Sequence, residues 1–180
     1  MKKLVIEVSK IPHEGLALDS PLEPEALHLE GERSFRLASG NLRARLEKGD
    51  EESVHVRGHL DARLSLDCGR CLEPFEMNLD QDLELFFLPH VADQVEEEDE
   101  VELSDHDMVV AYYRDNRLDL GEAVREQLVL GVPLKAVCRE SCQGLCASCG
   151  VNRNLTACAC TIEESEDPRL APLRKLFEKH

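Results

Sequence analysis

Six cysteines lie within 23 residues toward the C-terminal end of the sequence, a density that points to metal binding. Cys146-x-x-Cys149-Gly150 has the form of a zinc knuckle, in which backbone amides point at the first sulfur and the glycine takes the positive φ that closes the turn. Tetrahedral zinc needs four ligands. We expect them to be four of the six thiolates of Cys138, Cys142, Cys146, Cys149, Cys158 and Cys160, without deciding which four.

Composition supports this expectation. Between residues 138 and 160 the only large apolar side chains are Leu145, Val151 and Leu155, so a metal would supply folding free energy that a hydrophobic core cannot. The spacings do not match the C-x-x-C-x-x-C runs of ferredoxins, which favours zinc over an iron–sulfur cluster. Inert thiols and redox switching are the alternatives.

A second cysteine motif, Cys68-x-x-Cys71, lies between two stretches of alternating apolar and polar residues. Two thiolates at such a bend suit a metal ion or a reversible disulfide, and two small thiols closing a turn are the plain alternative. If the flanking strands extend to the tip, Cys68 continues the apolar face of the first and Cys71 that of the second, so both sulfurs point to the same side. Whether this pair reaches the later cysteines cannot be derived from spacing.

Other chemistry is sparse. The sequence has no phosphate-binding loop, no G-x-S-x-G and no GxGxxG motif, and its seven histidines are scattered. We therefore expect a protein that is not an enzyme and has no small-molecule substrate.

The elements that would position the first pair are the clearest in the sequence. Residues 54–66 and 75–87 alternate apolar and polar side chains, which predicts the two long strands of one hairpin. Gly58 predicts a bulge in the first strand. Shorter strands are expected at 4–8, 34–38, 42–47 and 108–113, a helix over 119–130, and a terminal helix that begins at Asp167-Pro168.

These elements predict an α+β fold with a mainly antiparallel sheet, which a barrel-like closure could complete. We expect residues 1–133 to form a β-rich body with one helix, with an acidic loop at about 89–107. Residues 134–180 would form the cysteine-rich metal-binding segment and the terminal helix.

The charge of the chain bears on its partners, and its hydropathy bears on its location. The net charge is −16, and nine Asp or Glu between Asp93 and Asp107 account for much of it, which disfavours unaided binding to nucleic acid. Arg70, Arg139 and Arg153 near the cysteines are candidate contacts to RNA or a partner. No stretch of about 18 apolar residues and no signal peptide is evident, so we expect a cytoplasmic protein with reduced thiols and no membrane span.

The two cysteine motifs resemble those of the bacterial YceD family. The resemblance rests on Leu66-Asp67-Cys68-Gly69-Arg70-Cys71-Leu72-Glu73-Pro74, on the run from Cys142 to Asn154, on Cys158-x-Cys160, and on Asp167-Pro168-Arg169-Leu170. The resemblance covers most of the second half of the chain. The first 50 residues resemble the family only loosely, in their general character.

The resemblance implies a role in ribosome biogenesis, namely processing or accumulation of large-subunit (23S) rRNA. The expected partners are rRNA or a ribosomal protein of the large subunit, the latter because basic ribosomal proteins favour an acidic surface. Two alternatives remain: a thiol-disulfide redox protein using Cys68 and Cys71, and a zinc-dependent adaptor unrelated to ribosomes.

Overall fold

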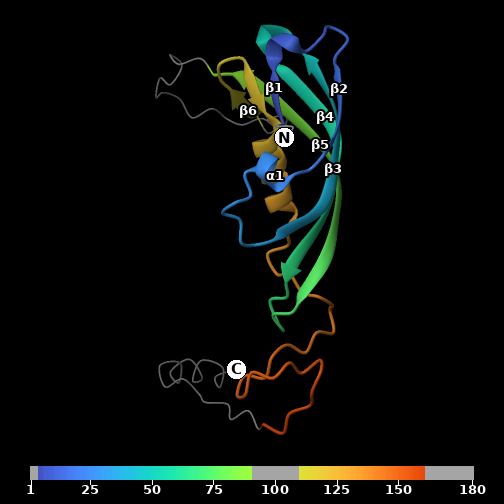
Figure 1. Cartoon of the computed structure of the whole chain (residues 1–180), viewed down its shortest axis with the longest axis vertical. Coiled ribbons are helices and arrows are strands. Elements are labelled where there is room, and N and C mark those ends of the chain that lie inside the picture. The colour runs from blue at the N-terminus through green and yellow to red at the C-terminus, as the bar shows by residue number, and fades with distance from the viewer. Residues whose placement is uncertain (1–3, 91–109, 161–180) are drawn as a thin grey trace, which may run out of the picture.

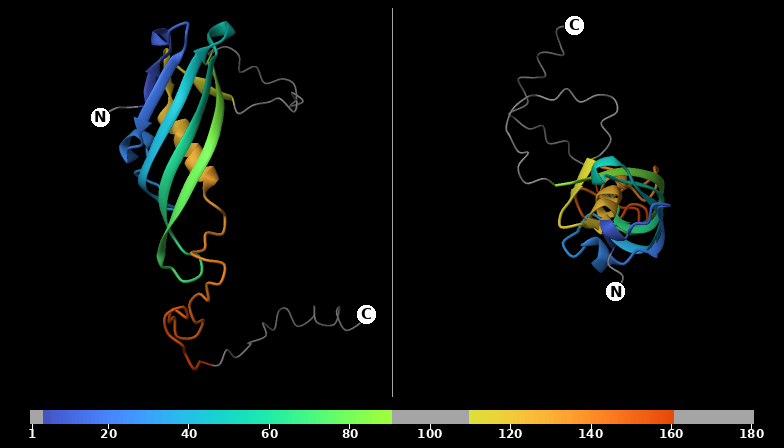
Figure 2. Two further views of the ribbon diagram at one scale, coloured as in Figure 1. Left: turned by 90° about the vertical axis from the view of Figure 1, so that its right-hand side faces the viewer. Right: turned by 90° about the horizontal axis from the view of Figure 1, so that it is seen from above.

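A computed structural model describes residues 4–90 and 110–160. It is elongated, with a β-rich body at one end and a small lobe at the other, as Figures 1 and 2 show. The expected terminal helix and nearly all of the expected acidic loop lie outside the described residues. In chain order the elements, with η for a 3-10 helix, are β1 (Val5–Glu7), η1 (Val8–Lys10), β2 (Leu16–Pro21), η2 (Pro24–Leu27), β3 (Arg36–Lys48), η3 (Asp50–Glu52), β4 (Val54–Asp67), β5 (Pro74–Pro89), β6 (Val110–Tyr113), β7 (Arg117–Asp119) and α1 (Leu120–Gly131).

The predicted α+β class and the predicted hairpin are confirmed. Five strands form one sheet in the order β2-β3-β4-β5-β6, in which only β5 and β6 run parallel. Strands β4 and β5 pair without interruption from Val54 opposite Phe87 to Asp67 opposite Pro74. A second, two-stranded sheet pairs β1 with β7.

The expectation of a barrel-like closure is wrong. Within the described residues, the edge strands β2 and β6 pair with β3 and β5 and not with each other. Instead, α1 lies inside the curve of the sheet (Figure 2), and its Leu120, Val124 and Leu128 are buried in the same core as the strands. Because the helix covers the apolar face, the sheet buries that face without joining its edges.

Two strand details also differ from expectation. The segments predicted at 34–38 and 42–47 belong to one strand, β3, whose register shifts between Leu37 and Ser39. No bulge occurs at Gly58, which pairs in register with both neighbours. A Cβ at Gly58 would lie 2.6 Å from the Arg43 carbonyl oxygen, so the glycine permits close approach of β3.

The hairpin's alternation separates a buried face from a charged one. Val56, Leu60 and Leu64 of β4 are fully buried. On the opposite face, charged side chains pair across strands, as in the 2.9 Å contact of Arg57 with Glu84. The 14 residues of β4 span roughly 45 Å at the usual rise of a strand, which carries the hairpin tip beyond the body.

Helix α1 confirms the helix expected at 119–130. Asp119 caps it by accepting hydrogen bonds from the backbone N–H groups of Gly121 and Glu122. The helix ends at Gly131, two residues before Pro133. From there the chain runs to the hairpin tip, where Gly69 N–H donates to the Ala136 carbonyl at 2.8 Å. The tip (residues 67–74) and residues 134–160 together form the unit that we call the cysteine lobe.

Candidate metal centre

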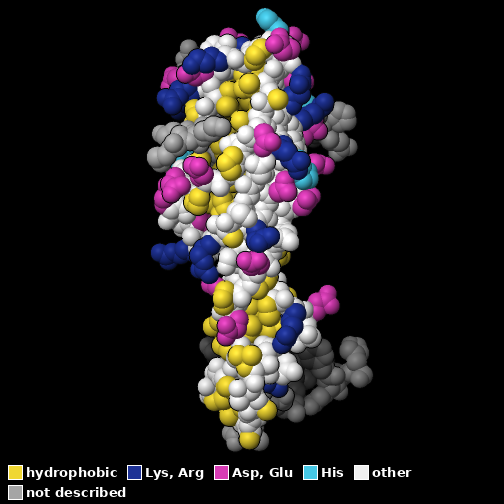
Figure 3. Space-filling model, turned by 45° about the vertical axis from the view of Figure 1, so that its right-hand side comes forward, with side chains coloured by type: hydrophobic (Ala, Val, Ile, Leu, Met, Phe, Trp, Pro, Cys, Tyr) yellow, Lys and Arg dark blue, Asp and Glu magenta, His cyan; other side chains and the backbone are white. Residues whose placement is uncertain are grey.

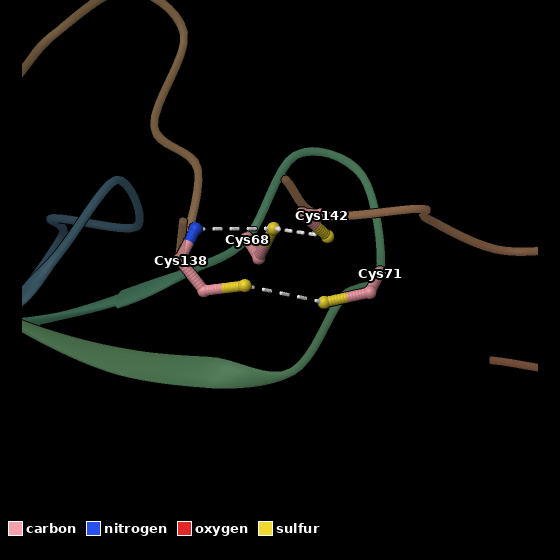
Figure 4. A group of neighbouring side chains, drawn as sticks. All are labelled: Cys68, Cys71, Cys138 and Cys142. Carbon is pink, nitrogen blue, oxygen red and sulfur yellow. Dashed lines mark hydrogen bonds between the residues drawn. The ribbon is translucent and has the colours of Figure 1, made fainter. Parts of the chain in front are cut away.

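Four cysteines from two distant parts of the chain converge at the base of the cysteine lobe. Cys68 and Cys71 come from the hairpin tip, and Cys138 and Cys142 from the segment after α1 (Figure 4), with all four sulfurs within 4.8 Å of one another. Sγ of Cys68 lies 3.8 Å from Sγ of Cys142, and Sγ of Cys71 lies 3.8 Å from Sγ of Cys138. Four thiols around one point make a site that could bind a metal ion.

Hydrogen bonds prepare two of these four thiols for ligation. Backbone N–H groups of Cys138 and Arg70 donate to Cys68 Sγ at 3.4 and 3.5 Å. The bond from Cys138 contributes most to lowering the pKa of Cys68, to about 6. Burial opposes ionisation of Cys142, yet hydrogen bonds from the Asn154 side chain and the Gly144 amide lower its pKa.

The other two thiols of this group have raised pKa values. Burial, with the neighbouring sulfurs, raises the pKa of Cys138 to about 12, and the pKa of Cys71 is also raised. Because a metal binds the thiolate, loading this site displaces these protons, and affinity for the metal rises with pH.

Direct hydrogen bonds also join the tip to the segment. Leu145 N–H donates to the Arg70 carbonyl at 3.0 Å, and the Arg70 guanidinium donates to the carbonyls of Glu140 and Cys142 at 2.9 and 3.0 Å. Together with the bond from Gly69, these contacts place the first cysteine group where the two chain segments meet.

The remaining cysteines form a second group, at the far end of the lobe from the hairpin. Sulfurs of Cys146, Cys149, Cys158 and Cys160 lie within 4.8 Å of one another. Backbone hydrogen bonds from Cys149 and Ser148 lower the pKa of Cys146 to about 6, whereas the neighbouring Cys149 raises the pKa of Cys160 to about 12. Cys149 and Cys160 are exposed, so this second site is more open to solvent than the first.

The two C-x-x-C turns share one backbone geometry. Gly150 N–H donates to the Cys146 carbonyl at 2.9 Å, and Gly150 has the positive φ (72°) that the sequence predicts. In the first turn, Leu72 N–H donates to the Cys68 carbonyl at 2.9 Å, and Leu72 has a φ of 62°. Both turns are therefore knuckles of the same kind, each aiming two sulfurs at one point.

The structure divides the six cysteines that the sequence offered as one ligand set. Cys146 and Cys149 lie with Cys158 and Cys160, whereas Cys138 lies with Cys142 and the hairpin pair. Spacing alone could not show whether Cys68 and Cys71 lie near the later cysteines, because more than 60 residues separate the two segments.

The three arginines proposed as contacts differ in their surroundings. Arg70 donates to two carbonyls, and Arg139 donates to Asn154 Oδ1 at 3.0 Å. Within the described residues, the side chain of Arg153 has no hydrogen bond or ion pair. Arg70 and Arg139 thus hold the lobe together, and Arg153 faces outward with its charge available.

One residue that supports the site was not anticipated. Asn154 donates to Cys142 Sγ, and its Oδ1 accepts from Gln143 N–H at 2.9 Å as well as from Arg139. The only sequence signal is an asparagine two residues after another, within a cysteine-rich run. A side chain that bonds both a ligand and the ligand's own loop orients the sulfur toward the metal.

Comparisons with known proteins add independent information. A relative from Mycobacterium tuberculosis, named an uncharacterized protein, is 37% identical over 128 residues, which cover 70% of this chain and 56% of that protein. The "Large ribosomal RNA subunit accumulation protein YCED homolog 1, chloroplastic" of Zea mays is 36% identical over 64 residues, covering 36% of this chain and 22% of that protein. The chain thus spans little more than half the length of the first relative and less of the second.

No solved structure matches the chain. Among the described residues, no helix has the length and apolar character needed to cross a membrane. The family model described as "Large ribosomal RNA subunit accumulation protein YceD" matches residues 56–177, a range that contains all but the first two residues of the hairpin and all eight cysteines. The match covers more than half of the sequence, and the chain therefore belongs to the YceD family.

Proposed function

We propose that this protein is a non-enzymatic ribosome biogenesis factor that supports accumulation of large-subunit (23S) rRNA by binding rRNA or a large-subunit ribosomal protein. The observation that carries the proposal is the family match over residues 56–177. The plant relative named for large ribosomal RNA subunit accumulation matches part of the same chain, which supports this class of function.

Zinc is the ion that we assign to both cysteine groups. With a Zn–S bond of about 2.3 Å, two sulfurs of a tetrahedral site lie roughly 3.8 Å apart. The pairs Cys68–Cys142 and Cys71–Cys138 have this separation. Four protein ligands close the coordination sphere, so each ion would support structure and would leave no position for a substrate.

Redox catalysis by Cys68 and Cys71 is less well supported. The low pKa of Cys68 suits a reactive thiolate, but its side chain is fully buried, with its sulfur 3.8 Å from that of Cys142. A catalytic thiol has to meet the substrate's disulfide. Metal ligation accounts for both the low pKa and the burial.

Deleting the gene tests the proposal. We expect the ratio of 23S to 16S rRNA to fall and the protein to sediment with large-subunit precursors in sucrose gradients of wild-type cells. Complementation with the intact gene should restore the ratio. An unchanged ratio, together with absence of the protein from precursor fractions, would refute the function.

Zinc content is measured separately. Elemental analysis of the protein purified under reducing conditions should give two zinc ions per chain, since two separate groups of four thiols are present. Cys142→Ser and Cys160→Ser should each lower the content to one. A content near zero would contradict the assignment of zinc without bearing on the ribosomal role.

A further inference from the structure

The residue that follows the second cysteine differs between the two knuckles, and at the first knuckle this residue brings no structural benefit among the described residues. Gly150 follows the second knuckle and Leu72 follows the first, both with left-handed backbone and the same N–H to carbonyl bond. Glycine adopts this conformation without steric cost, whereas a leucine side chain disfavours it.

Burial does not offset this cost. The Leu72 side chain is 65% exposed, and it is absent from both clusters of packed apolar side chains. A strained residue that gains no packing against the described part of its own chain is a candidate for contact with another molecule.

Other exposed leucines belong to the same lobe. Leu155 is 77% exposed and Leu134 is fully exposed. Leu155 is linked to the hairpin tip through Asn152. Leu155 N–H donates to the Asn152 carbonyl, and the Asn152 side chain donates to Glu73, which follows Leu72 in the sequence. Figure 3 shows hydrophobic side chains gathered on the narrow lower part of the molecule.

We propose that Leu72, with Leu155, forms a docking surface on the cysteine lobe for a basic protein segment that carries apolar side chains. The inference deepens the proposed function, on which it rests, by naming the partner class and the surface that receives it. Leu72 would enter an apolar site on the partner, and the surrounding charges would select a cationic one.

Charge favours a protein over RNA as the occupant. The lobe has four basic side chains (Arg70, Lys135, Arg139 and Arg153) and three acidic ones (Asp67, Glu73 and Glu140). Two of the basic groups are engaged by internal acceptors, as described above. A divalent ion on four thiolates adds two negative charges per site, so two loaded sites give the lobe a net charge of −3.

The described residues outside the lobe include more Asp and Glu than Lys and Arg, so the β-rich body is acidic as well. Phosphate contacts need clustered Lys and Arg, and each contributes to a strong salt dependence. A lobe with few available cations and exposed leucines suits a basic protein with an apolar anchor.

The test compares Leu72→Gly and Leu72→Asn with the wild-type full chain. Both replacements tolerate left-handed backbone, so we expect unchanged zinc content and a melting temperature that is equal or higher. Tyr112→Thr is the matched control, because Tyr112 is 64% exposed on β6, in the body and away from the lobe (Figure 1). The probes are proteins extracted from purified large ribosomal subunits and, separately, deproteinised large-subunit rRNA.

We expect wild type and Tyr112→Thr to bind a basic protein of the extracted fraction, identified by mass spectrometry and then titrated as a purified species. Both Leu72 variants should bind it about tenfold more weakly or worse, the loss expected when a buried leucine is removed. Equal binding by the Leu72 variants would overturn the inference, and so would binding to rRNA alone or to neither probe.

The proposed function has its own readout. If the wild-type protein still sediments with large-subunit precursors while the Leu72 variants bind as well as wild type, only the docking surface is refuted. If deletion leaves the rRNA ratio unchanged and the protein is absent from precursors, the function itself fails.

Discussion

Removing the metal should release residues 134–160 from the hairpin tip while leaving the β-rich body folded. The two parts depend on different interactions. The main core contains no cysteine, and the only apolar cluster at the tip is the small one around Cys68, Cys71 and Cys142. Chelation under reducing conditions therefore acts on the lobe alone.

The size of the effect follows from the contacts that remain without metal. Four hydrogen bonds of 3.0 Å or less join the tip to the segment: from Gly69 to Ala136, from Leu145 to Arg70, and two from the Arg70 side chain. Two others, from Cys138 to Cys68 Sγ and from Asn152 to Glu73, are longer, at 3.4 Å, and add little. At about 0.5–1.5 kcal/mol net for each bond, the shorter bonds contribute about 2–6 kcal/mol. Ordering the backbone costs roughly 1–2 kcal/mol for each residue, so a segment of this length needs tens of kcal/mol. Direct contacts alone cannot keep it docked.

Hydrogen exchange on the full chain measures this release. In the zinc-loaded protein, the amides of Gly69 and Leu145 should be protected, because both donate to carbonyls across the tip–segment boundary. After chelation, we expect their protection to fall at least about thirtyfold, the factor that corresponds to 2 kcal/mol. The amides of Leu60 in β4 and of its partners in β3 and β5 should retain their protection.

Matched single variants separate the two sites. Cys142→Ser disables the site that joins tip and segment, so it should reproduce the loss at Gly69 and Leu145 even with zinc present. Cys160→Ser disables only the second site and should leave both amides protected. Protection that persists at Gly69 and Leu145 in the metal-free chain would refute the argument, as would loss of protection throughout β4.

Three further outcomes concern the body. Leu60→Ala should lower the free energy of unfolding by about 2–5 kcal/mol in urea titrations, because Leu60 is fully buried in the core. Asp119→Ala should lower it by about 0.5–2 kcal/mol, measured by thermal melting, because it removes the cap of α1. His59→Gln should alter the pH dependence of stability. The hydrogen bond to Asp82 raises the pKa of His59, so the stabilisation is complete below about pH 6.5 and is lost as pH rises through the higher folded-state value. The melting temperatures of wild type and variant should therefore differ more at about pH 5.5 than at about pH 9.

Local patterns in the sequence predicted local structure well. The alternation over 54–66 and 75–87 reflects a sheet with one buried and one solvated face, and the hairpin has that register. The same parity placed the two tip sulfurs on one side, and they do lie in one group. Gly58 was misread because a glycine that permits close strand approach and one that marks a bulge give the same signal.

The sequence patterns could not predict which distant segments of the chain lie together in the fold. The spacing of Cys138 and Cys142 constrains their own loop only, so nothing in it indicates that the hairpin tip completes their site. The open sheet was missed for a similar reason. Whether a curved sheet closes depends on what fills its concave side, and here α1, which follows β7 directly, does so.

The position of the lobe explains why binding and stability should be separable in this protein. Long strands carry the first cysteine group away from the core, and four thiols would fix the later segment to it without drawing on core residues. A partner that docks on the lobe therefore need not disturb the packing of Leu60 or α1. Conversely, a core variant that retains zinc should keep its partner affinity at temperatures below its melting point. Because of this independence, we expect Leu72→Gly to weaken binding while the fold keeps or gains stability.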